Sequence, residues 1–113
     1  GLPRWVGLRK ALEIALLCEP FDAAEALRLG MVNRVVPADA LIEHTLAWAR
    51  QIEASAPQAV ARLKRLMRDA DQQDLHTQLQ AEMRAFVACA GTADFAEGVA
   101  AFLAKRPAQF SGQ

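Results

Sequence analysis

The carboxylates are the side chains of this sequence with the widest chemical scope, because general acid–base catalysis needs an acid and a base about one water apart. Four glutamates fall at polar positions of segments with a helical apolar pattern: Glu43, Glu53, Glu82 and Glu97. Each is expected on an exposed helix face, so none forms a convincing pair. The sequence therefore predicts no catalytic residue in this chain.

Metal sites and covalent nucleophiles are not indicated either. His44 and His76 lie far apart, neither has a second ligand three or four residues on, and the cysteines lack CxxC spacing. The only serines, Ser55 and Ser111, are interpreted as a helix cap and a tail residue. A triad built on an activated hydroxyl has no candidate here. We expect no metal site.

The charges of the chain are balanced, with 13 Lys and Arg against 13 Asp and Glu. No net field then draws the protein toward nucleic acid or a membrane surface, and neither partner is expected. One basic run comprises Arg62, Lys64, Arg65 and Arg68. It lies opposite an apolar stripe that contains Leu63, which favours a solvated helix face over a polyanion patch. No glycine-rich phosphate loop is present.

Length and composition predict a single domain over residues 1–113, since 113 residues with 53% hydrophobic content suit one core but not two. The longest uncharged apolar run is far below the roughly 20 residues that cross a bilayer. Cys18 and Cys89 are expected as buried thiols in a reducing cytoplasm. The chain starts with Gly1 instead of Met, which fits a trimmed product or a start inside a longer reading frame.

The elements around these side chains are predicted to be mostly α-helical, with about six helices and at most one short strand. Apolar spacing and capping residues predict helices over 8–17, 23–29, 39–54, 55–70, either 71–91 or 74–91, and 92–106. The expected N-caps are Asp22 in a capping box with Glu25, Asp39, Ser55 in a capping box with Gln58, either Asp71 or Asp74, and Thr92. Pro107 is expected to end the last helix.

The most specific stretch is FDAAEALRLGMVNRVVP, residues 21–37, which holds a capped helix, a Gly30 stop, an extended run and a proline. Residues 31–36 carry three valines, which suits a pleated strand. No second strand is visible. The run is therefore either merely extended or paired with another chain.

The order of these motifs resembles the C-terminal half of the crotonase superfamily, the enoyl-CoA hydratases and isomerases. The resemblance is carried by LPRWVG at 2–7, EPFDA at 19–23, GMVNRVVP at 30–37 and EGVAAFLAKR at 97–106. It implies that the two catalytic glutamates and the backbone oxyanion hole lie upstream of the part that this chain matches. It also implies an oligomer interface, so we expect a dimer or trimer.

The resemblance implies a ligand role for two residues of the last helix. In the family an aromatic and a lysine at the positions of Phe102 and Lys105 contact the nucleotide of coenzyme A. A ring can pack on adenine, and an ammonium can pair with a phosphate. Phe102 can equally be a core residue, and Lys105 a lysine favoured by the helix dipole.

Two functions follow as expectations. In the first, the chain is the C-terminal part of an acyl-CoA enzyme with a coenzyme A thioester as ligand, and it is not catalytic without an N-terminal catalytic partner chain. In the second, it is a free-standing helical interaction or oligomerisation module without ligand function. A small nucleic-acid-binding bundle is disfavoured by the zero net charge.

Overall fold

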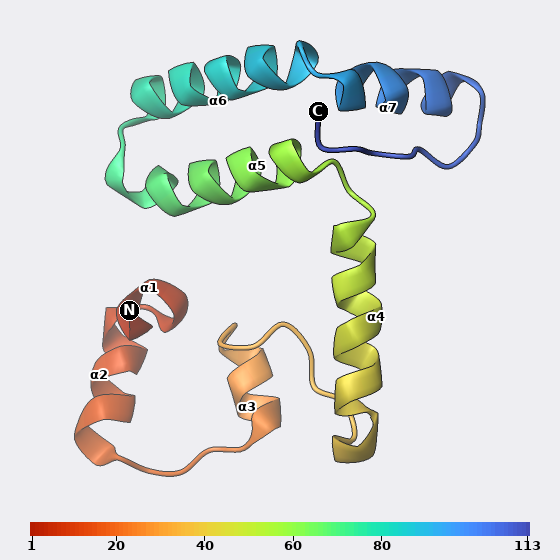
Figure 1. Cartoon of the computed structure of the whole chain (residues 1–113). Helices are drawn as coiled ribbons and strands as arrows, with labels where there is room; N and C mark the ends of the chain where they lie inside the picture. Colours follow the sequence, from red (N-terminus) through yellow and green to blue (C-terminus); the bar gives the residue numbers. More distant parts are fainter. The chain divides into compact units, whose positions relative to one another are not determined.

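The computed structural model describes residues 1–113 and contains seven α-helices, two short 3-10 helices and no strand (Figure 1). The predicted mostly α fold class is confirmed. The chain divides into two compact units, Gly1–His44 and Thr45–Gln113, and the boundary between them falls within α4.

The first unit starts with two helices that contact each other, α1 (Leu2–Val6) and α2 (Leu8–Leu17). The bounds of α2 are those predicted from its apolar spacing. Gly7 separates the two helices with a φ of 79°, a conformation that glycine adopts without strain. This break makes α1 a helix of its own and raises the number from about six to seven.

Helix α3 (Ala23–Arg28) begins as predicted, because the Asp22 carboxylate accepts a hydrogen bond from the Glu25 backbone N–H at 2.8 Å. The Glu25 carboxylate does not return to the cap. It pairs with the Arg28 guanidinium through two hydrogen bonds of 2.6 Å. Only half of the predicted capping arrangement therefore forms.

The end of α3 is a Schellman motif. The Gly30 N–H donates to the Leu27 carbonyl at 3.0 Å, and the Met31 N–H donates to the Ala26 carbonyl at 2.9 Å. Gly30 is in the left-handed conformation with a φ of 71°, which favours glycine even though an added β-carbon would have no heavy atom within 4 Å.

The valine run that follows is neither helix nor strand within this chain, which agrees with the alternative of a merely extended run. Val32 and Val35 are 41% and 46% exposed. Asp39 lies inside the 3-10 helix η1 (Ala38–Ala40), which leads into α4 (Leu41–Glu53). The prediction that Asp39 is an N-cap was therefore wrong, because a tighter turn starts at Pro37 before the α-helix does.

The second unit contains the remainder of α4, then α5 (Pro57–Asp69), η2 (Ala70–Gln72), α6 (Leu75–Ala90) and α7 (Ala93–Leu103). Helices α5 and α6 contact each other and run antiparallel, with η2 at the turn (Figure 1). After α7 the chain turns and runs back toward the start of α5. Pro57 occupies the first turn of α5, as predicted.

Two predicted caps of this unit have different outcomes. Asp74, not Asp71, caps α6, and its carboxylate accepts from the Thr77 N–H at 2.8 Å. The Ser55–Gln58 capping box does not form. The N-cap of α5 is Ala56 without a side-chain bond, and Gln58 donates to the Gly112 carbonyl 54 residues away.

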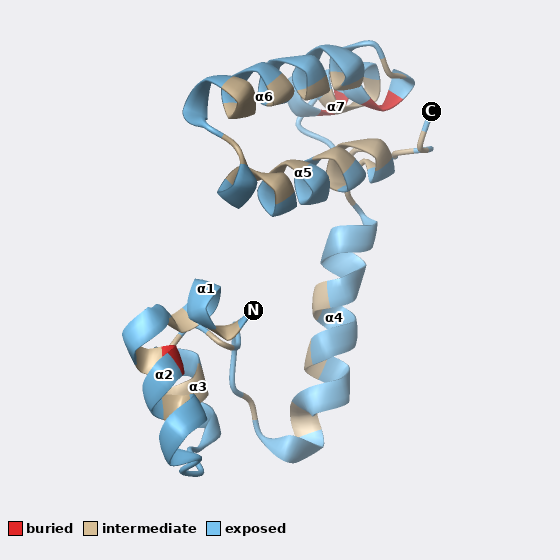
Figure 2. Cartoon of the chain, turned by 90° about the vertical axis from the view of Figure 1, so that its left-hand side faces the viewer, coloured by how far each residue is buried: buried red, intermediate tan, exposed pale blue.

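Few side chains are buried in either unit (Figure 2). Ala11 and Ala101 are the only buried hydrophobic residues, whereas Leu16 and Phe86 are 77% and 64% exposed. A domain of ordinary packing would bury several large apolar side chains. Many of the apolar helix faces are thus uncovered within this chain. The expectation of buried thiols is wrong for Cys18, which is exposed.

No single helix has both the length and the hydropathy to cross a membrane. Helices α6 and α7 reach that length and composition only as a pair, across a bend of 78°.

Candidate functional site

The candidate site lies at the C-terminal end of α7, and it is positioned first by the start of that helix. The Thr92 hydroxyl accepts a hydrogen bond from the Phe95 N–H at 3.1 Å, which confirms the predicted N-cap. The same hydroxyl donates to the Cys89 carbonyl at 2.7 Å. The rings of Phe86 and Phe95 meet edge to face across the junction, with centroids 6.2 Å apart. Together these contacts fix the start of α7 against the end of α6.

Helix α7 ends at Leu103, three residues before the predicted end at Arg106. The Lys105 N–H donates to the Phe102 carbonyl at 3.2 Å, and the Arg106 N–H donates to the Ala101 carbonyl at 3.0 Å. These two bonds form a Schellman motif with Lys105 in the left-handed position at a φ of 52°. Residues 104–106 are named the Lys105 turn below.

A lysine at this position is unusual, because the left-handed conformation brings its β-carbon close to the backbone and costs about 1 kcal/mol. Glycine normally occupies it for that reason. A strained residue persists only where surrounding contacts hold it, and such residues are concentrated at functional sites. The conformation of Lys105 is thus an observation that points to a role for its side chain.

Glu97 and Arg106 hold the Lys105 turn against the helix. The Arg106 guanidinium donates two hydrogen bonds to the two Glu97 carboxylate oxygens, at 2.7 and 2.9 Å. The Gln109 backbone N–H donates to the same carboxylate at 2.8 Å. The Arg106 contact and then the Gln109 contact lower the pKa of Glu97 from 4.5 to about 2. A bidentate pair of this kind fixes both position and orientation.

Asp94, one turn before Glu97, holds the C-terminal tail. Its side chain is buried, and its carboxylate accepts from the Ser111 N–H at 2.7 Å, the Ser111 hydroxyl at 3.3 Å and the Gly112 N–H at 2.9 Å. The Asp94 N–H donates in turn to the Gln113 carbonyl at 3.1 Å. The two carboxylates of α7 therefore fasten the segment after the helix at two points, and the Lys105 turn is the start of that segment.

An apolar groove of about 360 Å³ runs beside α7 and the tail. Phe110 of the tail forms one wall and lies against Gly98, where an added β-carbon would come within 3.6 Å of the ring. Phe102 lies at the groove and is 83% exposed. A largely exposed ring of this size offers a flat apolar surface for another ring or chain.

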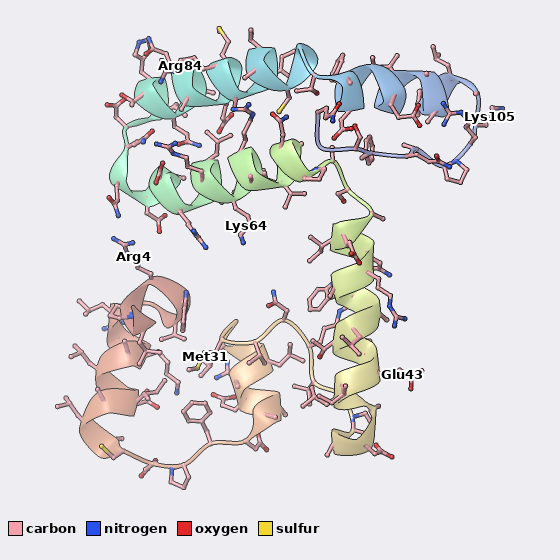
Figure 3. All side chains as sticks on the ribbon, viewed as in Figure 1. Arg4, Met31, Glu43, Lys64, Arg84 and Lys105 are labelled. Atoms are coloured by element: carbon pink, nitrogen blue, oxygen red, sulfur yellow. The ribbon has the colours of Figure 1, made fainter.

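The structure brings the two predicted site residues together on one turn. Lys105 lies where the chain leaves α7 (Figure 3), and its N–H bonds to the carbonyl of Phe102. Within this chain Phe102 is not a core residue, since its ring faces solvent. The position of Lys105 just beyond the helix end also favours a cation through the helix dipole.

The remaining candidates for chemistry are not brought together. Glu97 is ionised and bound to Arg106, and its low pKa makes it a poor general base. The His44 ring lies 3.1 Å from the Arg34 guanidinium, and the His76 ring lies 2.8 Å from the Gln80 amide. No group of three or more His, Cys, Asp or Glu side chains could hold a metal ion.

Asp94 and Glu97 were not singled out as a pair by the sequence. The available signal was two acids three residues apart at the start of the last helix, which places both on one face. Their partners lie nine to eighteen residues further along, in a tail that has no periodic pattern. The spacing of Asp94 and Glu97 therefore did not identify their partners in the tail.

The family model for enoyl-CoA hydratase/isomerase matches residues 1–113. A probable enoyl-CoA hydratase of Mycobacterium bovis is 39% identical over 110 residues, which are 97% of this chain and 43% of that protein. The 1,2-epoxyphenylacetyl-CoA isomerase of Escherichia coli is 36% identical over 113 residues, which are 99% of this chain and 43% of that enzyme.

Solved structures agree with the relatives. The crystal structure of the enoyl-CoA hydratase from Bacillus anthracis is similar to this chain with a TM-score of 0.95 at 36% identity, over 99% of this chain and 43% of that one. The chain spans less than half the length of these proteins and corresponds to their C-terminal portion. The resemblance seen in the sequence is confirmed, and the chain belongs to the enoyl-CoA hydratase/isomerase family.

Proposed function

We propose that this chain is the C-terminal portion of an acyl-CoA enzyme and that it contributes a coenzyme A contact and an oligomer interface. The observation that carries the proposal is the Lys105 turn, where a strained lysine lies three residues after the exposed ring of Phe102 in a member of this family. The ligand class is a coenzyme A thioester, and the relatives named above include an isomerase of 1,2-epoxyphenylacetyl-CoA.

The two side chains suit two parts of that ligand. The Phe102 ring offers a face on which adenine can stack, and the Lys105 ammonium offers a point charge for a phosphate. The Glu97–Arg106 pair fixes the turn before the ligand arrives, which reduces the entropy lost on binding. Arg106 is occupied by Glu97, whereas no carboxylate neutralises Lys105.

The chain is not expected to catalyse a reaction by itself. Hydration or isomerisation of an acyl-CoA needs an acid, a base and donors for the developing oxyanion. The two carboxylates near the candidate site are already bonded, Asp94 to the tail and Glu97 to Arg106. In the proposed enzyme those groups come from an N-terminal catalytic part.

Self-association follows from the uncovered apolar faces. Phe102 and Leu103 on α7 are 83% and 75% exposed, and Met83 and Val87 on α6 are 68% and 65% exposed. Large apolar side chains exposed in such number support an interface. The proposed assembly is a dimer or trimer. The proposed compartment is a reducing cytoplasm, which suits the two free cysteines. The free-standing interaction module remains the second candidate, but the family match does not favour it.

The test is a calorimetric titration of coenzyme A into the purified full chain. We expect micromolar binding that is lost in Lys105→Ala and weakened in Phe102→Ala. Lys64→Ala is the matched control, because Lys64 also lies on an exposed helix face but belongs to α5 (Figure 3). Equal binding by all four proteins, or no binding by any, would contradict the ligand role and favour the interaction module.

A further inference from the structure

A second groove, of about 730 Å³, lies between α5 and α6. Its volume is within the range of about 300–1,000 Å³ that is typical of small-molecule sites. Its floor is made of small side chains, which let a ligand approach the helix backbones: Ala61, Ala81, Ala85 and Ala88. Neither Phe102 nor Lys105 lines it, so it is not the groove of the proposed coenzyme A contact.

Three arginines line this groove, Arg62 and Arg65 from α5 and Arg84 from α6, against a single carboxylate, Asp69. Arg65 and Asp69 form an exposed pair at 3.8 Å, a contact that contributes little. The charge of the groove is thus strongly positive in a chain without net charge. Such a local excess attracts anions.

The hydrogen-bonding groups of the groove are not satisfied by the chain itself. The Nε atom of Arg62 is buried without a partner, and one of its terminal nitrogens makes only a 3.3 Å contact to the Gln58 amide oxygen. The amide oxygen of Gln73, at the other end of the groove, is also buried without a partner. Buried polar atoms are nearly always bonded. The Arg62 Nε–H is a donor that can bond an anion in the groove, whereas the Gln73 oxygen is an acceptor and would need a donor group.

The sequence favoured a solvated face for the whole basic run, and this holds for Lys64, Arg65 and Arg68, which are exposed, but not for the half-buried Arg62. Lys64 points away from α6 (Figure 3), and Arg68 does not line the groove. Arg62 and Arg65 lie three residues apart and both reach the groove. The run thus divides between two faces of α5.

We infer that the groove between α5 and α6 binds the phosphoryl group of a small phosphate monoester. Guanidinium forks match phosphate oxygens in pairs. Asp69 offsets the charge of Arg65, so Arg62 and Arg84 leave two positive charges in the groove, which a dianion balances. A carboxylate would leave one charge uncompensated. The volume exceeds that of a phosphate, and the alanine floor suits a flat apolar body. Free phosphate shares the same chemistry, so the test separates the two.

The test titrates phenyl phosphate, inorganic phosphate and phenol separately into the full chain. We expect phenyl phosphate to bind more tightly than inorganic phosphate, and phenol not to bind. Arg84→Gln and Arg62→Gln should each weaken binding of phenyl phosphate about tenfold, the value of one charged hydrogen-bond pair. Lys64→Gln, at an exposed residue of α5 that does not line the groove, should leave it unchanged.

Arg84 is exposed, so its replacement is expected to leave the fold intact even if Arg62→Gln does not fold. Equal affinity for both phosphates, lost in Arg84→Gln, would support the phosphoryl site and identify free phosphate as its ligand. Absence of phosphate binding at millimolar concentration, or full binding by Arg84→Gln, would overturn the inference. Neither Phe102 nor Lys105 lines this groove, so neither result bears on the coenzyme A contact.

Discussion

The ends of α3 and α7 have the same pair of backbone hydrogen bonds but different residues in the left-handed position. Gly30 closes α3 without strain, through two backbone hydrogen bonds to carbonyls of the same helix. Lys105 closes α7 against a conformational cost, and Glu97, Arg106 and the tail hold it. One end is stable by its local sequence alone. The other depends on long-range contacts, which is the pattern of a functional turn.

The largest effect is expected from Asp94→Ala, which removes the acceptor of three hydrogen bonds to the tail. The loss should be about 3 kcal/mol in free energy of unfolding, because charged hydrogen bonds are lost at a buried position. Asp22→Ala, which removes only the cap of α3, should cost about 1 kcal/mol. Urea unfolding followed by circular dichroism measures both. Equal losses of unfolding free energy in the two variants would show that the tail contacts of Asp94 contribute no stability beyond that of a helix cap.

Amide exchange gives an independent check on the same variant. The Ser111 and Gly112 amides should be protected in the unmodified chain and exchange freely in Asp94→Ala. Protection that persists in the variant would mean that other contacts hold the tail.

The second effect depends on pH. The pKa of Glu97 is lowered from 4.5 to about 2 in the folded chain, so its contribution is present above pH 4.5 and is lost as the pH falls toward 2. Glu97→Gln should therefore be less stable than the unmodified chain at pH 7, and the difference should vanish near pH 2. Glu25→Gln is the matched change at α3, where Arg28 also lowers the pKa.

The Glu25–Arg28 pair lies within a single helix turn, so its loss should have the smaller consequence for stability. A pH-independent difference for Glu97→Gln would contradict the role assigned to its charge. Carbon-detected titration of the Glu97 carboxyl would give the pKa directly.

The smallest effects come from exchanging the residues at the two helix ends. Gly30→Ala should destabilise the chain by about 1 kcal/mol, because an alanine at a φ of 71° is strained although nothing crowds it. Lys105→Gly should stabilise it by about 1 kcal/mol for the converse reason. The urea midpoint should fall in Gly30→Ala and rise in Lys105→Gly. Shifts of the same sign in both variants would contradict the prediction.

Local chemistry accounts for what could be predicted from the sequence. Asp22, Thr92 and Pro57 act within one helix turn of themselves, so their types and spacing were sufficient. The same holds for the bounds of α2, whose apolar repeat is uninterrupted. The family resemblance was carried by four such local motifs.

Long-range contacts account for what could not be predicted. Gln58 was assigned to a local capping box but donates to Gly112, which only the returning tail brings near. Lys105 was placed inside the last helix because nothing in AFLAKRP shows that a lysine takes the left-handed position. Both errors involve the returning tail, which Gln58 contacts from α5 and which starts at Lys105, where the candidate site lies.

The most direct test of the central claim is the dissociation constant of Lys105→Gly for coenzyme A, measured beside its stability. If the strain at Lys105 is retained for its side chain, the variant is more stable than the unmodified chain and binds coenzyme A at least tenfold more weakly, about 1.4 kcal/mol. A variant that is more stable and binds coenzyme A as tightly as the unmodified chain would contradict the claim.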